Sequence, residues 1–308
     1  MSYYIGLDGG GSKTEAALSD QNLQVLSRVK GGPTNYHSVG IDHVRNEIEC
    51  LLSELLSKAS IYINDIEGIC FGGAGIDSQT DKRVIEQLFN DYGYTKELKI
   101  YNDALPAMVA ILGEPKGGIL ISGTGSIAQG VSKDGELVRV GGWGHVIDDV
   151  GSGYNIGKDA LSAIMQSYDG RIKKSLLWEH LRKELKIEHQ EDLVGYVYAP
   201  ERRKQDIAAL AKSVIALDGF DPIAESLLDK AAKELCLMIQ ALAVKMEIDK
   251  FKLGLCGSVL TANNSVTSRL ANQLNDVLPD VTLAQSKERP YMGALRMASN
   301  RYRTGDLL

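Results

Sequence analysis

The stretch Tyr3–Thr14, YYIGLDGGGSKT, is a short apolar run that leads directly into three consecutive glycines. Further strands are expected at 13–19 and 23–29, separated by the polar turn Asp20-Gln21-Asn22. A hairpin with a glycine-rich tip can direct several backbone N–H groups at a phosphate, and three glycines exceed what a tight turn requires. The stretch therefore predicts a three-stranded meander whose first turn binds phosphate.

The same order of features returns at residue 118. An apolar run at 118–122 leads into Gly123-Thr124-Gly125-Ser126, and strands at 127–132 and 136–140 follow, with paired glycines after them. We interpret this as a diverged internal repeat, and hence as two similar domains, with chance similarity of two meanders as the alternative. The second glycine turn also matches G-x-G-x-x-A, but a hairpin follows where a dinucleotide site requires a helix.

The rest of the chain alternates helical and strand patterns. This order favours an α/β protein with mixed sheets, in which the second half is mostly helical. Strands are expected at 3–8, 68–71, 98–101, 252–256 and 281–284. Helices are expected at 41–59, 80–91, 103–112, 152–166, 173–185, 191–197, 204–217, 222–246, 263–276 and 289–300.

Composition excludes several classes of protein. The 308 residues carry a net charge of −6 with no basic run, which argues against nucleic-acid binding. No apolar stretch is long enough to span a membrane, and no signal peptide is visible, so we expect a cytoplasmic protein. None of Cys50, Cys70, Cys236 and Cys256 forms a C-x-x-C pair. We expect all four to be buried small hydrophobes rather than metal or iron–sulfur ligands.

Six segments together resemble one known family. They are DGGGSKT (8–14), GGPTN (31–35), GGAG (72–75), YNDA (101–104), SGTGS (122–126) and GGWGHVIDDVGSGYNIG (141–157), of which the last is the most specific. They resemble the N-acetylglucosamine kinase and BadF/BadG/BcrA/BcrD ATPase family of the actin-like superfamily. This branch also includes bacterial glucosamine and N-acetylmuramate kinases and the ATPase activators of 2-hydroxyacyl-CoA dehydratases. The resemblance runs from Tyr3 to about Asn300.

The resemblance implies two actin-like (ribonuclease H-like) domains with mixed sheets and an interdomain cleft. Residues 1–115 would form the N-terminal domain, with the sugar side and the first phosphate loop. Residues 116–308 would form the C-terminal domain on the nucleotide side, with a helical insertion at about 160–248. The last helix, at about 289–300, would pack back on the N-terminal domain.

On the nucleotide side, the resemblance implies MgATP as the phosphate donor. Asp8, at the end of its strand, is expected to hold Mg²⁺ directly or through water. The expected cofactor contacts are Gly10, Gly11, Ser12, Lys13 and Thr14 in the first loop, Gly123, Thr124 and Gly125 in the second, and Gly257 and Ser258 near adenosine.

On the sugar side, Asn35 can both donate to and accept from vicinal hydroxyls. His37 is expected to stack on the sugar or to hydrogen-bond it, and the alternative is a plain surface histidine. Asp103 starts a predicted helix, so from the sequence alone a helix N-cap is a serious alternative. The resemblance makes Asp103 the base that accepts the proton of the attacking hydroxyl. The remaining substrate contacts that it implies are Ser126, Gly142, Trp143 and Asp149.

We therefore expect an ATP-dependent kinase for the 6-hydroxyl of N-acetylglucosamine and also of N-acetylmuramic acid, acting in cell-wall recycling. The second sugar is favoured because Val150 stands where the family often has an acid. One alternative is a kinase of glucosamine or another hexose. The other is an ATPase activator that uses the nucleotide cycle as a switch. The expected partner is a small amino sugar, not nucleic acid or membrane, and a homodimer is left open.

Overall fold

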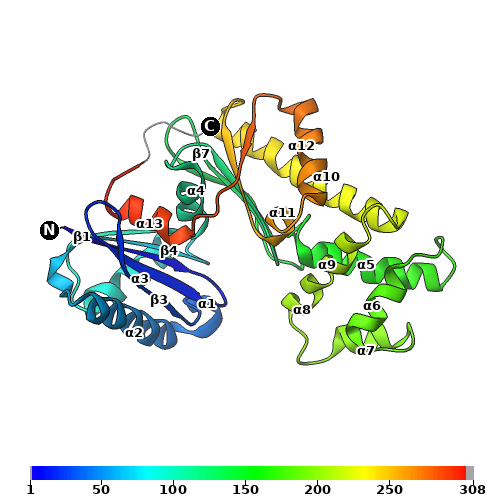
Figure 1. The fold of residues 1–308 in the computed structure, drawn as a ribbon, viewed down its shortest axis with the longest axis horizontal. Coiled ribbons are helices and arrows are strands. Elements are labelled where there is room, and N and C mark those ends of the chain that lie inside the picture. The colour runs from blue at the N-terminus through cyan, green and yellow to red at the C-terminus, as the bar shows by residue number, and fades with distance from the viewer. Residues whose placement is uncertain (1, 303–308) are drawn as a thin grey trace. The chain divides into compact units, whose positions relative to one another are not determined.

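The computed structural model describes residues 2–302, which form two compact units (Figure 1). Unit 1 contains residues 2–116 and 286–302 of the described chain. Unit 2 contains Gly117–Gln285. Each unit is built around one five-stranded sheet.

Unit 1 has five strands, five α-helices and one 3₁₀ turn among its described residues. In chain order they are β1 (Tyr3–Gly9), β2 (Thr14–Ser19), β3 (Val25–Gly31), α1 (Tyr36–Val39), α2 (Ile41–Ala59), η1 (Ile63–Asp65), β4 (Ile66–Gly73), α3 (Gln79–Asp91), β5 (Glu97–Asn102), α4 (Ala104–Leu112) and α13 (Pro290–Ala298). The expected meander, the long helix at 41–59 and the αβ alternation after it are confirmed.

Unit 2 has five strands and eight helices, several of which follow the expected periodicities closely. In chain order they are β6 (Gly118–Ser122), β7 (Ser126–Val131), β8 (Leu137–Gly141), α5 (Gly153–Tyr168), α6 (Leu177–Leu185), α7 (Asp192–Tyr198), α8 (Lys204–Ala209), α9 (Ala211–Ala216), α10 (Pro222–Met246), β9 (Lys252–Cys256), α11 (Ser258–Thr261), α12 (Ser265–Val277) and β10 (Thr282–Ala284).

The two sheets share one topology. The order in unit 1 is β3-β2-β1-β4-β5, and the order in unit 2 is β10-β9-β6-β7-β8, which is the same arrangement read from the other edge. In each, the first three strands pair antiparallel, and the last two join the first in parallel. The internal repeat inferred from the glycine turns is therefore a repeat of structure.

The sheet of unit 1 is covered on both faces because alternate residues of β1 point to opposite sides. Ile5 and Leu7 are fully buried against the core formed with α2 and α3. Gly6 faces α13, and a Cβ there would lie 2.6 Å from the backbone nitrogen of Leu295. The absence of a side chain lets α13 lie directly on the strand, beside α4 (Figure 1).

The predicted helix at 204–217 is wrong in one respect, because it consists of two short helices, α8 and α9. The glycines of α5 lie tightly against α8 where the two helices cross. A Cβ on Gly157 would lie 2.1 Å from the carbonyl oxygen of Ile207, and one on Gly153 would lie 3.1 Å from that of Ala208. We associate the break with this close approach, which an uninterrupted periodicity does not reveal.

The expectation for the cysteines holds only in part. Cys70 and Cys236 are buried, Cys256 is intermediate and Cys50 is exposed. Cys50 lies in α2, whose buried stripe contains Ile48, Leu51 and Leu52, so its position falls outside the apolar face. Among the described residues, no helix is both long and apolar enough to cross a membrane.

Candidate functional site

The first glycine hairpin encloses a small open pocket at the ends of β1 and β2. The backbone nitrogen of Gly10 donates to the carbonyl oxygen of Lys13 at 2.9 Å and closes the turn. The pocket is lined by Asp8, Gly10, Gly11, Ser12, Lys13 and Glu15. Gly11 and Ser12 are exposed, as a loop that contacts a phosphate must be.

Carboxylates crowd the base of this hairpin. Asp8 and Glu15 are paired residues of β1 and β2. Burial, together with the charges of Asp103 and Glu15, raises the pKa of Asp8 to about 7. Glu15 is only 3% exposed, and its Oε1 accepts from the Lys13 ammonium at 3.0 Å.

This arrangement fits a divalent cation. Oε2 of Glu15 is buried and has no hydrogen-bond partner among the described residues, so an electropositive group at this place would satisfy it. No group of three or more metal-binding side chains is found within residues 2–302. Mg²⁺ is commonly held by one or two carboxylates together with water and substrate phosphates, so an Mg²⁺ site at Asp8 stays a prediction.

Thr14 differs from the other residues assigned to the first loop. It is fully buried, and its hydroxyl lies 2.9 Å from the hydroxyl of Thr34. The sequence places Thr14 among the phosphate contacts, but in the structure its side chain fastens β2 to the segment after β3. A phosphate contact by Thr14 stays a prediction.

Asp103 stands at the N-cap position of α4 but makes no side-chain capping hydrogen bond. Asn102 does this instead, because its Oδ1 accepts from the backbone nitrogen of Ala104 at 3.1 Å. The helix that follows is buried along its whole length, which gives Asp103 a rigid base. Burial, with a contribution from the charge of Asp77, raises the pKa of Asp103 to about 6. The N-cap interpretation therefore loses its main support.

Asn35 directly precedes the short helix α1, which the sequence pattern does not predict. Its side chain caps α1, because Oδ1 accepts from the backbone nitrogen of His37 at 3.1 Å. The amide also lies against the loop after β4, where a Cβ on Gly75 would come within 2.9 Å of Oδ1. A glycine with φ +81° is thus required beside Asn35.

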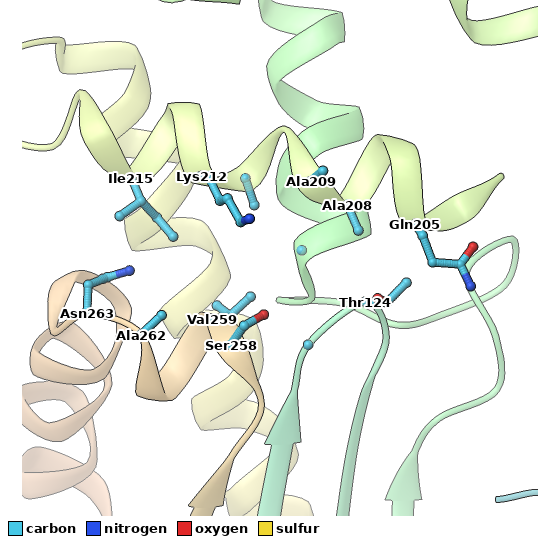
Figure 2. A pocket seen from close by; sticks show the side chains of 13 residues that line it. Thr124, Gln205, Ala208, Ala209, Lys212, Ile215, Ser258, Val259, Ala262 and Asn263 are labelled. Carbon is cyan, nitrogen blue, oxygen red and sulfur yellow. The ribbon is translucent and has the colours of Figure 1, made fainter. Parts of the chain in front are cut away.

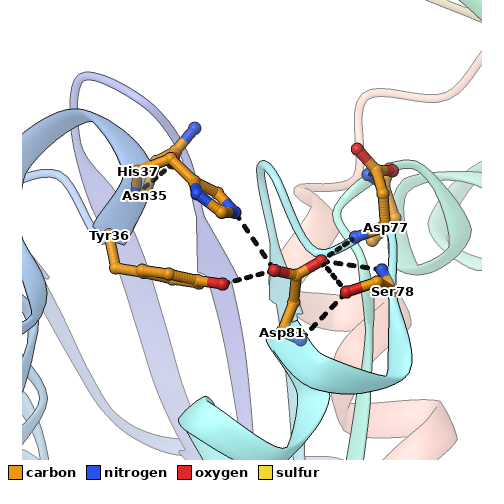
Figure 3. Close-up of polar contacts among 7 residues, drawn as sticks. Asn35, Tyr36, His37, Asp77, Ser78 and Asp81 are labelled. Atoms are coloured by element: carbon orange, nitrogen blue, oxygen red, sulfur yellow. Dashed lines mark hydrogen bonds and ion pairs between the residues drawn. The ribbon is translucent and has the colours of Figure 1, made fainter.

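His37 is half-exposed, and its ring is already engaged (Figure 3). Nε2 lies 3.1 Å from Oδ1 of Asp81, and the ring stacks at a tilt on Tyr36, with centroids 4.0 Å apart. The expected ring-nitrogen hydrogen bond exists, but its partner is a protein carboxylate. A sugar contact by His37 stays a prediction.

The second glycine hairpin is tied to the loop before α5. The backbone nitrogen of Gly153 donates to the carbonyl oxygen of Gly123 at 2.7 Å, and that of Tyr154 donates to Thr124 at 3.3 Å. The hydroxyl of Ser126 donates to the carbonyl oxygen of Val150 at 2.6 Å. These contacts fix the turn before any ligand binds. Val150 also packs its side chain against the apolar core of unit 2.

Asp149 lies beneath this hairpin. It is 5% exposed, it has a φ of +56°, and its Oδ1 accepts from the backbone nitrogen of Ser126 at 3.4 Å. Burial raises the pKa of its carboxyl group above the usual range. Trp143, by contrast, is 63% exposed, and the guanidinium of Arg139 stacks on its ring at 4.1 Å. Gly142, at φ +74°, precedes it. Of the residues predicted to bind sugar in unit 2, Asp149 and Ser126 are therefore buried and hydrogen-bonded, whereas Trp143 is exposed.

A larger pocket in unit 2 joins the second hairpin to the start of α11 (Figure 2). Thr124 and Ser258 lie on its floor, and small side chains of α8 and α9 form the opposite wall. The residues that line it are Gly123, Thr124, Gly153, Gln205, Ala208, Ala209, Ala211, Lys212, Ile215, Ser258, Val259, Ala262 and Asn263. The alanines give an apolar slot, and Lys212 and Gln205 add polar ends, which suits a flat polar heterocycle.

The structure thus gathers the sequence-predicted residues into groups within each unit. In unit 1 the hairpin residues lie beside Asp103, whose charge acts on Asp8. In unit 2, Gly123 and Thr124 share a pocket with Ser258. Sequence reasoning missed the contribution of α8 and α9, including Lys212, and it missed Asp81. Ala208, Ala209 and Ala211, with Leu210 between them, are the sequence signal for a wall of small side chains.

Comparison with known proteins agrees with these features. N-acetylmuramic acid/N-acetylglucosamine kinase of Clostridium acetobutylicum is 36% identical over 97% of this chain and 98% of its own. N-acetyl-D-glucosamine kinase of Dictyostelium discoideum is 30% identical over 96% and 98%. A solved structure from Chromobacterium violaceum superposes with a TM-score of 0.76, at 22% identity, over 96% of this chain and 98% of that one.

The structural likeness shows a shared fold, and the predicted class of two actin-like domains with mixed sheets is confirmed. A family model matches residues 5–298, nearly the whole described chain. The chain therefore belongs to the BadF/BadG/BcrA/BcrD ATPase family.

Proposed function

We propose that this protein is an ATP-dependent kinase of N-acetylated amino sugars, which phosphorylates the 6-hydroxyl of N-acetylglucosamine and of N-acetylmuramic acid. The observation that carries the proposal is the state of Asp103. Its side chain stands at the start of a buried helix without making a capping hydrogen bond, and burial raises its pKa to about 6. A base with that pKa is ionised at neutral pH and still able to take up a proton.

The chemistry follows from the residues of each unit. In unit 1, Asp103 accepts the proton of the attacking hydroxyl while Asn35 orients the sugar. Asp8, with Glu15 beside it, would hold Mg²⁺, whose charge offsets the negative charge on the phosphates. In each unit the glycine hairpin binds phosphate oxygens through backbone N–H groups other than those of Gly10 and Gly123, which already donate to Lys13 and Gly125 within their turns. The pocket beside Ser258 takes the adenine. Phosphoryl transfer depends mainly on such orientation and charge placement.

The choice of sugar rests on the relatives and on one residue. The Clostridium relative, at 36% identity, acts by its name on both N-acetylmuramic acid and N-acetylglucosamine. Val150 stands where the family often has an acid, so a negative charge is missing at that one position, although Asp148 and Asp149 come directly before it. We therefore include both sugars and place unacetylated glucosamine second.

The test is a coupled ADP-release assay with N-acetylglucosamine, N-acetylmuramate, glucosamine, glucose and no sugar. An N-acetylhexosamine should raise the rate by more than about tenfold, because the nucleophile itself comes from the sugar. Equal rates with and without sugar would instead favour a nucleotide-switch ATPase. A reproducible iron–sulfur absorbance of the purified protein would point the same way.

A further inference from the structure

Asp81, in the first turn of α3, has no part in the proposed chemistry, yet it is among the most heavily bonded acids of unit 1 (Figure 3). It is 7% exposed. Its Oδ1 accepts from the hydroxyl of Tyr36 and lies 3.1 Å from Nε2 of His37. Its Oδ2 accepts from the backbone nitrogens of Asp77 at 3.1 Å and Ser78 at 2.7 Å, and from the Ser78 hydroxyl at 2.7 Å. The two oxygens therefore hold two different segments of the chain.

A helix cap accounts for only half of these contacts. Ser78 and Asp81 form a capping box, in which each side chain bonds the backbone of the other, and this occupies Oδ2. The contacts of Oδ1 with α1 add nothing to that cap. Burial acts to raise the pKa of Asp81, but the hydroxyls of Ser78 and Tyr36 outweigh it and hold the pKa well below its usual range. The carboxylate is thus held ionised at a junction.

Each of the two segments that meet at Asp81 is hydrogen-bonded to a residue that we expect to bind the sugar or to a direct neighbour of one. On the α1 side, the backbone nitrogen of His37 bonds the side chain of Asn35. On the other side, Oδ1 of Asp77 accepts from Nδ2 of Asn102 at 3.1 Å, and Asn102 in turn precedes Asp103. One hydrogen-bonded chain therefore runs from Asn35 through Asp81 to the residue beside the proposed base.

We propose that Asp81 is a positioning residue for sugar binding: its two oxygens lock the Asn35 segment onto the loop before α3 and so set the affinity for the sugar. The inference rests on the proposed function, and it adds to it a residue that touches no substrate. A displacement of about 1 Å in a binding group is enough to weaken binding or rate severely, so a latch of this kind has a measurable effect.

Asp81→Asn is the direct test. The hydroxyl and backbone groups at the carboxylate all donate, whereas an amide offers one accepting oxygen and one NH₂ group, so one of the two sides must face a second donor. The KM for the sugar should rise about tenfold, with kcat within about threefold and the KM for ATP unchanged, the pattern of lost ground-state binding.

A matched pair separates positioning from capping. Tyr36→Phe removes a donor on the α1 side only, so we expect a KM for the sugar several-fold higher and a Tm close to that of the wild type. Ser78→Ala removes a contact on the cap side only, so we expect a lower Tm and an unchanged KM. The double variant Tyr36→Phe/Asp81→Asn should raise KM by less than the product of the single effects, because both act at one contact.

The failures are distinguishable. A wild-type protein with no sugar-dependent ADP release and no sugar binding in calorimetry overturns both the proposed function and this inference. An active wild type with the same KM for sugar in Asp81→Asn and Tyr36→Phe overturns this inference alone. In that case Asp81 is only the cap of α3.

Discussion

The two glycine hairpins stand at the same place in sheets of the same topology, yet their surroundings differ in kind. The first is flanked by charge, with Asp8, Lys13 and Glu15 lining its pocket. The second is flanked by hydroxyls, because Ser122 and Ser126 both donate to backbone carbonyl oxygens of the loop before α5, at 2.9 and 2.6 Å. Oε2 of Glu15, at the first hairpin, is a buried acceptor with no hydrogen-bond partner among the described residues, whereas the buried carboxylate of Asp149, beneath the second, accepts from the backbone nitrogen of Ser126.

The two hairpins share a backbone arrangement but differ in the side chains around them. Both hairpins offer backbone N–H groups, which is a property of the fold. The side chains around them decide the chemistry. The clustered carboxylates at the first hairpin suit a site that binds a cation and transfers a proton, and the hydrogen-bonded turn of the second suits binding of the nucleotide alone. The comparison predicts that substitutions of the charged residues at the first hairpin, and of Asp103 beside it, will change the chemical step, and that substitutions at the second will change binding and stability.

Asp103→Asn should have the largest effect. Asparagine keeps the shape and can still hydrogen-bond a hydroxyl, but it cannot take up its proton, and a general base typically contributes about 10²–10⁴-fold. We expect kcat to fall within that range in steady-state assays. Sugar affinity by calorimetry should change by less than about 1.5 kcal/mol, the scale of one hydrogen bond.

Asn102→Ala is the matched control for this position. Asn102, not Asp103, caps α4, so Asn102→Ala should lower Tm, whereas Asp103→Asn should not. An Asp103→Asn enzyme with full kcat and normal stability would rule out the base assignment. Asp149 would then become the leading candidate.

The raised pKa of Asp103 predicts that kcat depends on pH, and we expect this effect to be the next largest after that of Asp103→Asn. Only the ionised carboxylate can accept the proton, and its pKa is about 6. Below that pH, kcat should fall about tenfold per pH unit, and this limb should be absent from the residual activity of Asp103→Asn. The assay needs saturating Mg²⁺, because a bound cation favours the ionised form of Asp8.

The raised pKa of Asp103 affects stability in the opposite direction, because the ionised form favours catalysis but destabilises the folded protein. A carboxyl whose folded pKa lies above its unfolded value binds its proton more tightly when folded, so its ionisation destabilises the protein as pH rises through about 4 to 6. Asp103→Asn should therefore raise Tm at about pH 7.5 and change it little at about pH 4. A lower Tm at the higher pH would contradict the burial of this charge.

Much of this fold could be predicted, because glycine turns and helical periodicity are local signals. The strands around both hairpins and the long helices α2 and α10 follow directly from them. The tertiary details could not be predicted. Nothing in the spacing of Thr14 and Thr34 announces a buried hydroxyl pair, and the bonds between Asp81 and α1 join residues more than 40 positions apart.

A pair of glycine substitutions tests this comparison of the two hairpins, and we expect a change of about tenfold in the KM for ATP. A Cβ on Gly125 would lie 2.8 Å from Oδ2 of Asp149, whereas a Cβ on Gly11 would meet nothing within 4 Å. Gly125→Ala should lower Tm and raise the KM for ATP together, since the turn must move. Gly11→Ala should leave Tm unchanged, so any loss of activity there reports contact with the nucleotide. A drop in Tm from Gly11→Ala alone would reverse our account of which hairpin is internally fixed.

The smallest effect on activity is expected at Thr14. Its hydroxyl and that of Thr34 satisfy each other in the interior, so Thr14→Val strands the Thr34 hydroxyl at a cost of about 1–3 kcal/mol. Thermal unfolding should show this loss, with the KM for ATP within about twofold of the wild type, because no hydrogen bond to the nucleotide is removed. Thr14→Val/Thr34→Val should recover part of the stability, since neither hydroxyl is then left alone.

Ser12→Ala, at the exposed tip, should show the converse: an unchanged Tm and a raised KM for ATP. If Thr14→Val raised the KM for ATP as much as Ser12→Ala while Tm stayed unchanged, Thr14 would be a phosphate contact after all.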